Sequence, residues 1–421
     1  FCVKINKEIA LGRAYYYIYQ IGGIIYMNKT LKKVLKTILI IVIVLLVAVV
    51  LFIGYLTVTE YKPEATEALN IEGSSSKTLA EGDDFTIMTW NMGYAGLADN
   101  ADFFMDGGEH VRSCSESQVN DNIDAVVDEI EKENADVVFL QEVDRNSKRS
   151  YKIDEFKKIT SSLTDYSATY GCNYKVAYVP YPLPTIGKVD CGIATLSAFN
   201  VDSSERVSLP CPFKYPIRLG NLKRCLMVNR VAIDGTDKEL VLVNLHLEAY
   251  DDGEGKIAQT KQLKELLEDE AAKGNYVIAG GDFNQSFSNY DNSAYPLISE
   301  DMWQPGAVDV DQFDDSLSFI TDNSTPSCRS LDRPLAGNDS DPSVFQYYMI
   351  DGFIVSDNLT INTVETRDLG FKNSDHNPIV IKIRNDKKAR AHLLPPFYYG
   401  NISSSILVST FNMRYPIPMC V

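Results

Sequence analysis

The chain has 421 residues, of which 45% are hydrophobic and 23% charged, a composition that indicates a globular protein and excludes a largely disordered one. The length allows more than one domain, although a large two-sheet fold uses roughly 250 to 300 residues as a single unit. A formal net charge of −17 argues against a protein that coats nucleic acid, because such a protein needs a basic surface. A nuclease with one local basic groove stays compatible with this charge.

Two segments precede the expected domain. Residues 1–26 come before Met27-Asn28-Lys29, which resembles a natural start, so we interpret 1–26 as an upstream or disordered segment. Residues 27–60 are expected to form a basic flank and a transmembrane anchor. Within them, residues 37–59 are 23 consecutive uncharged residues, and a helix of that length spans roughly 34 Å, enough for the hydrocarbon core of a bilayer.

The charges around this apolar segment predict its orientation. Glu60 follows it closely, and four basic residues precede it, at Lys29, Lys32, Lys33 and Lys36. The positive-inside rule therefore predicts a cytoplasmic N-terminus and a single-pass protein of the cell membrane, with everything after residue 60 extracytoplasmic.

The next segments define the expected domain. Residues 61–83 are polar and contain Pro63 and a Gly-Ser-Ser-Ser run, which predicts a linker. Apolar strands are expected at 85–90, 136–140, 240–247, 347–355 and 378–383, the last two of these closing the domain, and amphipathic helices at 118–134 and 256–273. Strands and helices that alternate at uneven spacing indicate an α/β domain with mixed sheets over residues 84–384. Residues 385–421 form a tail of unknown role.

Some features leave alternatives open. Eight cysteines lie singly with no C-x-x-C pair, so we expect no zinc site, and whether the six within the domain form disulfides stays open. Aromatic or proline-rich segments at 103–108, 178–184 and 211–216 either shape substrate entry, insert at a membrane surface or cover a sheet edge. The basic run Arg145, Lys148 and Arg149 either attracts an anionic substrate or is a solvated face.

Polar residues lie at or next to the ends of the apolar strands. They are Asn91, Glu142, Asn244 with His246, Asp282 with Asn284, and Asp375 with His376. A single residue of this kind is usually a turn residue or a helix cap. Strand ends in α/β sheets converge on a crevice, however, so together these residues predict a functional site.

These residues belong to six short motifs: T-W-N at 89–91, L-Q-E-V at 140–143, N-L-H-L at 244–247, G-D-F-N at 281–284, I-D-G-F at 350–353 and S-D-H-N-P at 374–378. In this order they resemble the endonuclease/exonuclease/phosphatase superfamily, which includes pancreatic-type deoxyribonuclease, exonuclease III, neutral sphingomyelinases and inositol polyphosphate 5-phosphatases. The resemblance implies a membrane-anchored, bacterial-type member. Its expected fold is a four-layer α/β sandwich of two packed mixed β-sheets flanked by helices, preceded by one transmembrane helix.

The resemblance also implies ligands for a metal and for the substrate. Glu142, Asn91 and Asp375 are expected to hold Mg²⁺ or Mn²⁺, because these hard cations prefer oxygen ligands. The substrate phosphate is expected to contact Asn244, Asn284 and His246.

The catalytic residues that the resemblance implies are His246, Asp282, Asn284, Asp351 and His376. In this set His376 is the catalytic histidine, oriented by the Asp351 carboxylate, and Asp282 aligns or deprotonates the attacking water. Whether His376 or Asp282 takes the proton stays open. His246 resembles the deoxyribonuclease-like, sphingomyelinase-like and inositol phosphatase-like branches, since the abasic endonucleases carry no histidine in this motif.

The resulting hypothesis is a membrane-anchored, divalent-metal-dependent phosphoester hydrolase, foremost a phosphodiesterase, in which water attacks phosphorus. Its substrate would be a lipid head group, a nucleic acid or a small phosphoester, and no obligate protein partner is inferred. The alternatives are an extracellular nuclease and a non-catalytic surface binding module that retains the fold. An enzyme that faces the cytoplasm is a further alternative.

Overall fold

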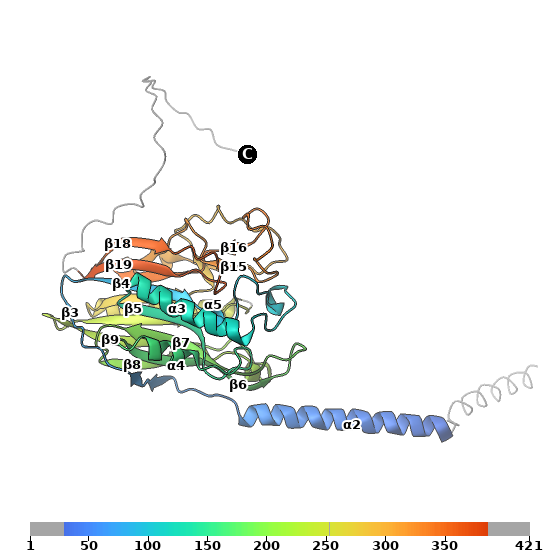
Figure 1. Cartoon of the computed structure of the whole chain (residues 1–421). Helices are drawn as coiled ribbons and strands as arrows, with labels where there is room; N and C mark the ends of the chain where they lie inside the picture. Colours follow the sequence, from blue (N-terminus) through green and yellow to red (C-terminus); the bar gives the residue numbers. More distant parts are fainter. Residues whose placement is uncertain (1–28, 252, 386–421) are drawn as a thin grey trace, which may run out of the picture.

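The computed structural model describes residues 29–251 and 253–385 (Figure 1). The interpretations of residues 1–26 and of the tail beyond Asn385 lie outside the described residues. Within them the α-helices are α2 (Lys29–Val58), α3 (Glu116–Glu133), α4 (Glu155–Ser162) and α5 (Glu254–Ala272). Short 3₁₀ helices are η1 (Gly93–Ala95), η2 (Phe104–Asp106), η3 (Ile217–Gly220) and η4 (Val310–Gln312).

Two mixed sheets form the body of the domain. The first has the order β1 (Thr66–Ala68), β8 (Ser203–Ser208), β9 (Cys225–Asp234), β10 (Glu239–His246), β11 (Tyr276–Asp282), β17 (Asp351–Ser356) and β14 (Leu317–Ile320), with β3 (Leu79–Ala80) also paired to β9. The second has the order β18 (Leu359–Thr366), β19 (Ile379–Asn385), β4 (Asp84–Asn91), β5 (Val137–Asp144), β7 (Gly187–Ser197), β6 (Ser167–Val179) and β2 (Ile71–Glu72). Two small pairs lie outside them: β12 (Gln285–Phe287) with β13 (Gly306–Val308), and β15 (Cys328–Arg329) with β16 (Tyr347–Tyr348).

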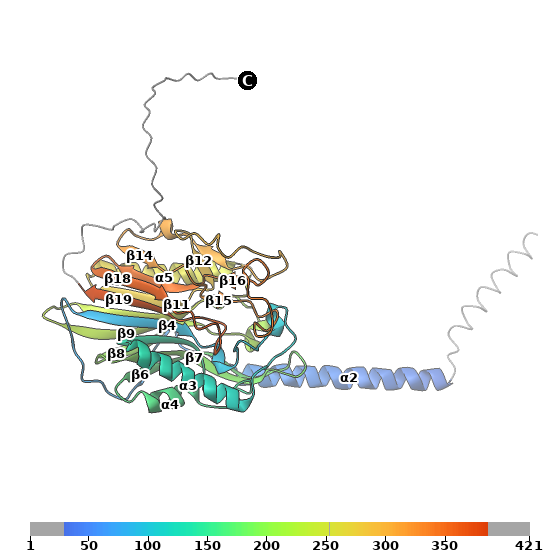
Figure 2. The ribbon, with the colours of Figure 1, turned by 45° about the horizontal axis from the view of Figure 1, so that its top comes forward.

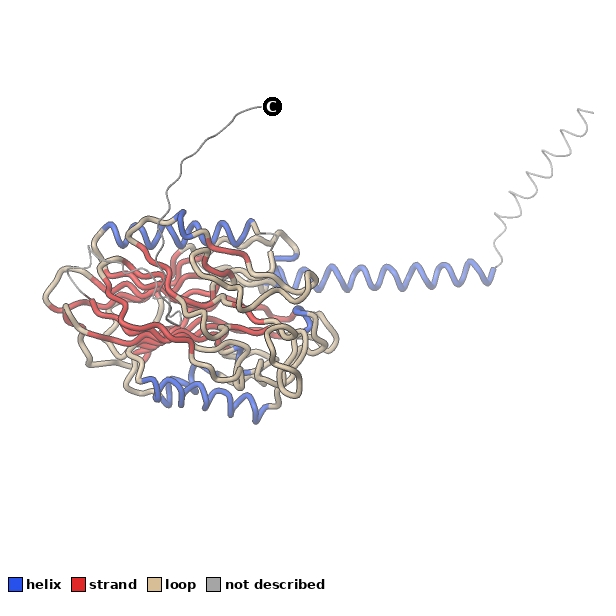
Figure 3. The backbone as a smooth tube through the Cα atoms, turned by 90° about the horizontal axis from the view of Figure 1, so that it is seen from above, coloured by secondary structure: helices blue, strands red, loops and turns tan. Residues whose placement is uncertain are grey.

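The two sheets pack face to face, and helices cover their outer faces. Phe139 on β5 and Phe353 on β17 are among the fully buried residues of the apolar layer between the sheets. The opposite face of the second sheet packs on α3 and α4, and that of the first packs on α5, for example through Leu263. Figure 3 shows the strands as a central double layer between helices. The predicted four-layer sandwich is therefore confirmed.

Helices α3 and α5 lie within two residues of the predicted ranges 118–134 and 256–273, and α4 was not predicted. The Ser115 side chain accepts a hydrogen bond from the Gln118 backbone N–H at the start of α3, and Asn134 ends the helix in the left-handed conformation (φ 47°). Helix α5 ends just before Gly274, whose φ of +80° is one that glycine adopts without strain.

The segment 61–83 is not a separate linker, and that prediction was wrong. Strand β1 pairs with β8, β2 with β6 and β3 with β9, so the segment extends both sheets. Leu79 is fully buried in the layer between the sheets. Proline and the Gly-Ser run mark turns between very short strands here, which no strand-length pattern reveals.

The C-terminal strands also differ from the prediction. The apolar stretch 347–355 is two strands, β16 and β17, separated by Met349 and Ile350. Strand β18, which comes between β17 and β19 in the sequence, was missed. It is the edge strand of its sheet, and because only two of its eight residues are buried it carries little apolar signal.

Helix α2 extends away from the domain (Figure 1). Its 30 residues are long and apolar enough to cross a membrane, and none of its most apolar stretch is buried against the rest of the protein. Only its C-terminal end contacts the domain, where Leu56 is buried against Val176 of β6 and Leu219 of η3. Among the described residues it is the single helix with this property.

Candidate active site

Strand pairing aligns three of the expected site residues. His246 ends β10 and is paired in register with Asp282, which ends the parallel strand β11. Asp282 is in turn paired with Asp351, which begins the antiparallel strand β17. A substituent at the neighbouring Gly281 (φ +149°) would strike the backbone oxygen of Leu245, so this close alignment requires glycine.

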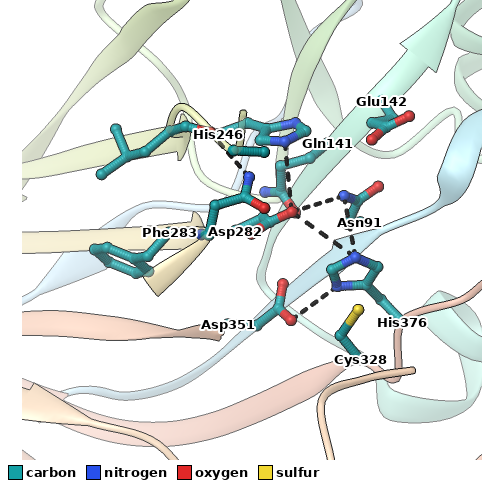
Figure 4. A network of polar contacts seen from close by, with 12 residues as sticks. Asn91, Gln141, Glu142, His246, Asp282, Phe283, Cys328, Asp351 and His376 are labelled. Carbon is teal, nitrogen blue, oxygen red and sulfur yellow. Dashed lines mark hydrogen bonds and ion pairs between the residues drawn. The ribbon is translucent and has the colours of Figure 1, made fainter. Parts of the chain in front are cut away.

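A chain of polar contacts links these residues to His376 (Figure 4). The His376 Nδ1 lies 2.8 Å from the Asp351 Oδ2, and its Nε2 lies 3.8 Å from the Asp282 Oδ2. The same Asp282 oxygen accepts a hydrogen bond from the Asn91 side-chain amide at 2.9 Å and lies 3.4 Å from the His246 Nε2. Residues from four separate motifs therefore meet at one carboxylate oxygen.

The backbone of His376 is held by its surroundings. The indole N–H of Trp90 donates to the His376 carbonyl at 2.9 Å, and the His376 N–H donates to the Ser374 hydroxyl at 3.2 Å. Ser374 in turn donates to the Asn91 carbonyl at 2.7 Å. The S-D-H motif is thus fixed against the end of β4, which orients the imidazole before any ligand arrives.

The two histidines have opposite charge preferences. Burial and the nearby charges of Arg224 and His376 hold the pKa of His246 well below its ordinary value. Burial also opposes a charge on His376, but the Asp351 carboxylate outweighs it and raises the pKa of His376 well above its ordinary value. Burial and the charge of Asp351 raise the pKa of Asp282 to about 7. His246 is therefore neutral and His376 charged near neutral pH.

Glu142 reaches the site through an irregularity of β5. The register between β5 and β7 shifts between Leu140 and Val143, and Glu142 has a positive φ of 55°. Such a bulge turns a side chain out of the regular alternation of a strand. The Glu142 carboxylate lies 3.9 Å from the Arg149 guanidinium and faces the pocket.

Glu142 and Asp375 form an oxygen-rich corner of the site. The pKa of Asp375 is raised to about 6. Burial is the main cause and the charge of Glu142 adds to it, whereas the charge of His376 acts in the opposite direction. Asp375 is buried and Glu142 half-buried, and two carboxylates that repel each other in such a place fit a divalent cation, which would offset both charges. The side-chain oxygen Oδ1 of Asn91 accepts from the Gly93 N–H at 3.0 Å, and Asn91 also lines the pocket.

Two other groups are close enough to hold an ion: Cys328 with Asp375 and His376, and Asp282 with Asp351 and His376. They fit a hard cation less well. Burial raises the pKa of the Cys328 thiol to about 12, so it stays protonated. The His376 Nδ1 is already engaged by Asp351. We therefore favour the carboxylate corner.

A cavity of about 290 Å³ opens above these residues. It is lined by all but two of the expected site residues, namely Asn91, Glu142, His246, Asp282, Asn284, Asp375 and His376. Asp351 lies behind His376 and acts on the cavity through that ring.

Asn244 does not reach the cavity, and its expected contact with the substrate phosphate disagrees with the geometry. The residue is fully buried. Its amide nitrogen donates to the Ala194 carbonyl at 2.8 Å and the Leu140 carbonyl at 3.3 Å, and its oxygen accepts from Gln141 at 2.8 Å. These contacts tie β10 to β5 and β7, so Asn244 is a positioning residue beneath the site.

Several residues of the cavity were missed or left open by the sequence. Arg149 lies in the cavity wall with its guanidinium 3.6 Å from the centre of the Tyr94 ring, and it forms two 3.0 Å hydrogen bonds to Asp144. Arg224 pairs with Glu248 at 3.3 Å and donates to the His246 carbonyl at 3.1 Å. Arg149 lies in the turn after β5 and Arg224 just before β9, so only the fold reveals that both line the cavity.

The domain cysteines are unpaired in the described part of the chain. Cys114, Cys172, Cys191, Cys211, Cys225 and Cys328 are all free thiols. The question left open by their spacing is thereby answered for these six.

The sequence matches the model of the Endonuclease/Exonuclease/phosphatase family over residues 88–376, more than half of the chain. The chain belongs to this family. No curated protein matches the sequence.

Solved structures with a similar fold include the following three. An endonuclease/exonuclease/phosphatase from Beutenbergia cavernae DSM 12333 is 17% identical, with 72% of each chain covered and a TM-score of 0.49. A family protein from Leptotrichia buccalis C-1013-b is 17% identical over 71% of this chain and 99% of that one, with a TM-score of 0.46. D. rerio TDP2, complexed with single strand DNA product, is 16% identical over 72% and 99%, with a TM-score of 0.44. Sequence identities and TM-scores this low do not identify a substrate for this chain.

Proposed function

We propose that the chain is a membrane-anchored, divalent-metal-dependent phosphoester hydrolase, foremost a phosphodiesterase, in which water attacks phosphorus. One observation carries the proposal: the Asp351–His376–Asp282 chain of contacts faces a cavity that also holds the Glu142 and Asp375 carboxylates. Hydrolysis of a phosphate ester requires groups that can accept and donate a proton and groups that can hold a metal ion. The first are provided by this chain of contacts and the second by the two carboxylates.

We infer the proton steps from this chain of contacts. Asp282, with a pKa raised to about 7 by burial and by Asp351, aligns the attacking water and accepts its proton as the oxygen–phosphorus bond forms. His376 is held charged by Asp351 and donates a hydrogen bond to a phosphate oxygen. His246 is neutral and donates an N–H hydrogen bond to the leaving oxygen, which departs as an oxyanion when the ester bond breaks and takes its proton from solvent.

The metal would be Mg²⁺ or Mn²⁺, held by Glu142 and Asp375 with assistance from Asn91. When bound, such an ion polarises the phosphoryl group and offsets its developing charge. Asn284 has one amide hydrogen bonded to the Leu247 carbonyl at 2.9 Å, which leaves its other amide hydrogen to contact the phosphate. Arg149 and Arg224 add positive charge to the cavity wall for an anionic substrate.

Helix α2 is proposed as the anchor. Its length and composition, its lack of burial and the basic residues before it support a single-pass protein with a cytoplasmic N-terminus and an extracytoplasmic domain. The cytoplasmic-facing alternative would be revealed by protection of the domain from protease added to whole cells.

The proposal is tested with bis-p-nitrophenyl phosphate and the full chain in detergent. Hydrolysis should require Mg²⁺ or Mn²⁺ and should fall by about 10²–10⁴-fold in Glu142→Ala and His376→Ala, the range for loss of acid–base or charge-stabilising groups. Asp315→Asn is the matched control, because this carboxylate is exposed and remote from the cavity. Inactivity of the metal-supplemented chain on diesters and monoesters alike would favour a binding module that keeps only the fold.

A further inference from the structure

Exposed apolar residues gather on two segments of the domain. Tyr178 lies at the end of β6, and Tyr181 and Leu183 lie in the connection from β6 to β7. Tyr215 lies just before η3, which begins at Ile217. Tyr181, Leu183 and Ile217 are 69%, 87% and 64% exposed. We call these five residues the aromatic surface. An apolar cluster of this kind on a domain needs a partner to cover it.

The aromatic surface is continuous with the end of α2. The ring of Phe52 in α2 meets Tyr178 edge to face with 6.2 Å between centroids, and the Thr57 hydroxyl lies 3.3 Å from the Tyr215 hydroxyl. Leu56 is buried beside them against Val176. The aromatic surface therefore lies where α2 would leave the bilayer. For this reason we infer that the bilayer is the partner that covers it.

The segments that carry the aromatic surface are basic, and three of their cations are paired with carboxylates outside them: Arg218 and Lys223 with Glu60, and Lys175 with Asp190. Residues 174–188 and 211–223 contain five basic residues and no acidic one, in a chain of net charge −17. The five are Lys175, Lys188, Lys214, Arg218 and Lys223. Tyrosine rings mixed with lysine and arginine are the composition of surfaces that rest at the membrane interface.

The mouth of the cavity lies on the same side of the domain. Tyr181 meets Phe104 of η2 with 5.8 Å between ring centroids, and the flanking Phe103 and Met105 line the cavity. Ile186 and Phe213, from the two segments that carry the aromatic surface, line it as well. Strands β15 and β16 lie on the side of the domain toward which α2 extends (Figures 1 and 2).

We propose that the aromatic surface docks on the lipid bilayer and holds the mouth of the cavity against the head-group layer, so that the site takes a phosphoester presented by a membrane lipid. The inference rests on the hydrolase and anchor proposed above. Docking removes the apolar side chains from water and sets the distance between the site and the lipid phosphate.

Contact with the bilayer is tested by tryptophan fluorescence of the full chain in phosphatidylcholine/phosphatidylglycerol vesicles that contain brominated lipid. In Leu183→Trp the added emission should be blue-shifted and quenched, after subtraction of the wild-type emission of Trp90 and Trp303. Asp237→Trp is the matched control, because Asp237 is exposed just before β10, at the opposite end of that strand from His246. Equal quenching at the two positions, or none at Leu183→Trp, would overturn the docking.

The consequence for the substrate is tested by comparing two reactions. Leu183→Glu combined with Ile217→Glu should lower hydrolysis of vesicle phospholipid at least 10-fold and leave hydrolysis of bis-p-nitrophenyl phosphate unchanged, since neither residue lines the cavity. Hydrolysis of the soluble diester without any phospholipid hydrolysis by the wild type would overturn this inference alone. If the wild type hydrolysed neither vesicle phospholipid nor bis-p-nitrophenyl phosphate, the proposed function itself would be overturned.

Discussion

At the scale of single residues, the site separates two histidines by their neighbours. His376 has a carboxylate at 2.8 Å, whereas His246 faces Arg224 and the charged His376 ring. His246 is thereby neutral and His376 positively charged, and the Asp282 carboxylate lies between the two rings. The acid–base roles follow from these surroundings more than from residue type.

Asp351→Asn tests the orientation of His376. The amide removes the charge that raises the pKa of His376, so this pKa should fall and kcat should drop by about 10²–10⁴-fold while KM changes little. Steady-state kinetics with bis-p-nitrophenyl phosphate and NMR titration of the imidazole measure the two effects. An unchanged imidazole pKa, with Asp315→Asn as reference, would contradict the assigned pairing.

Asp106 predicts a pH-dependent stability. It accepts a hydrogen bond from the Tyr250 hydroxyl at 2.9 Å, and burial raises its pKa from 3.8 to about 7. The folded state thus favours the protonated form, whose stabilisation is complete below the unfolded pKa and is lost as the pH rises through about 7. Asp106→Asn keeps the neutral form at every pH.

The melting temperature of Asp106→Asn minus that of the wild type should therefore increase between pH 4 and pH 8. Calorimetry of the metal-free full chain measures it, because a bound cation would offset neighbouring charges. A difference that stays constant or shrinks over this range would show that the Asp106 carboxyl ionises freely.

At the scale of elements, Asn244 shows how the two sheets are joined beneath the site. Asn244→Ala removes one acceptor of the Gln141 amide and the side-chain donor to the Ala194 carbonyl in a fully buried place, so the free energy of unfolding should fall by about 1–3 kcal/mol. KM should stay near the wild-type value. Urea denaturation and steady-state kinetics measure these, with the exposed Asn362→Ala as control. A raised KM at full stability would restore Asn244 as a phosphate contact.

The sequence predicted the strand ends but not how they meet. Polar residues such as Asp282 that end an apolar run are a local signal, and so are the helix caps at Ser115 and Asn134. The register that sets His246 beside Asp282 and Asp351 joins strands far apart in the chain, and no local pattern encodes it. The motif resemblance supplied that part.

Features without a periodic signal were missed for physical reasons. The strands within 61–83 are two or three residues long, too short for any alternation to show. Asn244 has the polarity of a ligand, but its whole hydrogen-bonding capacity is used inside the protein. Arg224 reaches the cavity only because β9 pairs with β10.

At the scale of the whole molecule, α2 and the cavity are related by geometry. The aromatic surface joins the end of the helix to the loops at the cavity mouth, through Phe52, Tyr178, Tyr181 and Phe104. Segments 174–188 and 211–223, which carry the aromatic surface, contain no acidic residue, although the chain as a whole has a strong negative charge. A tethered domain with this arrangement would meet phosphate groups of the bilayer before those in solution.

In the proposed reaction water attacks phosphorus, and a divalent metal is required. Hydrolysis of bis-p-nitrophenyl phosphate by the full chain in ¹⁸O-labelled water with Mg²⁺, followed by mass spectrometry of the products, tests both features. We expect one ¹⁸O in the phosphate product, none in nitrophenol and no reaction after chelation of the metal. Label in nitrophenol would exclude attack at phosphorus, and hydrolysis that persists in the chelator would exclude the metal dependence.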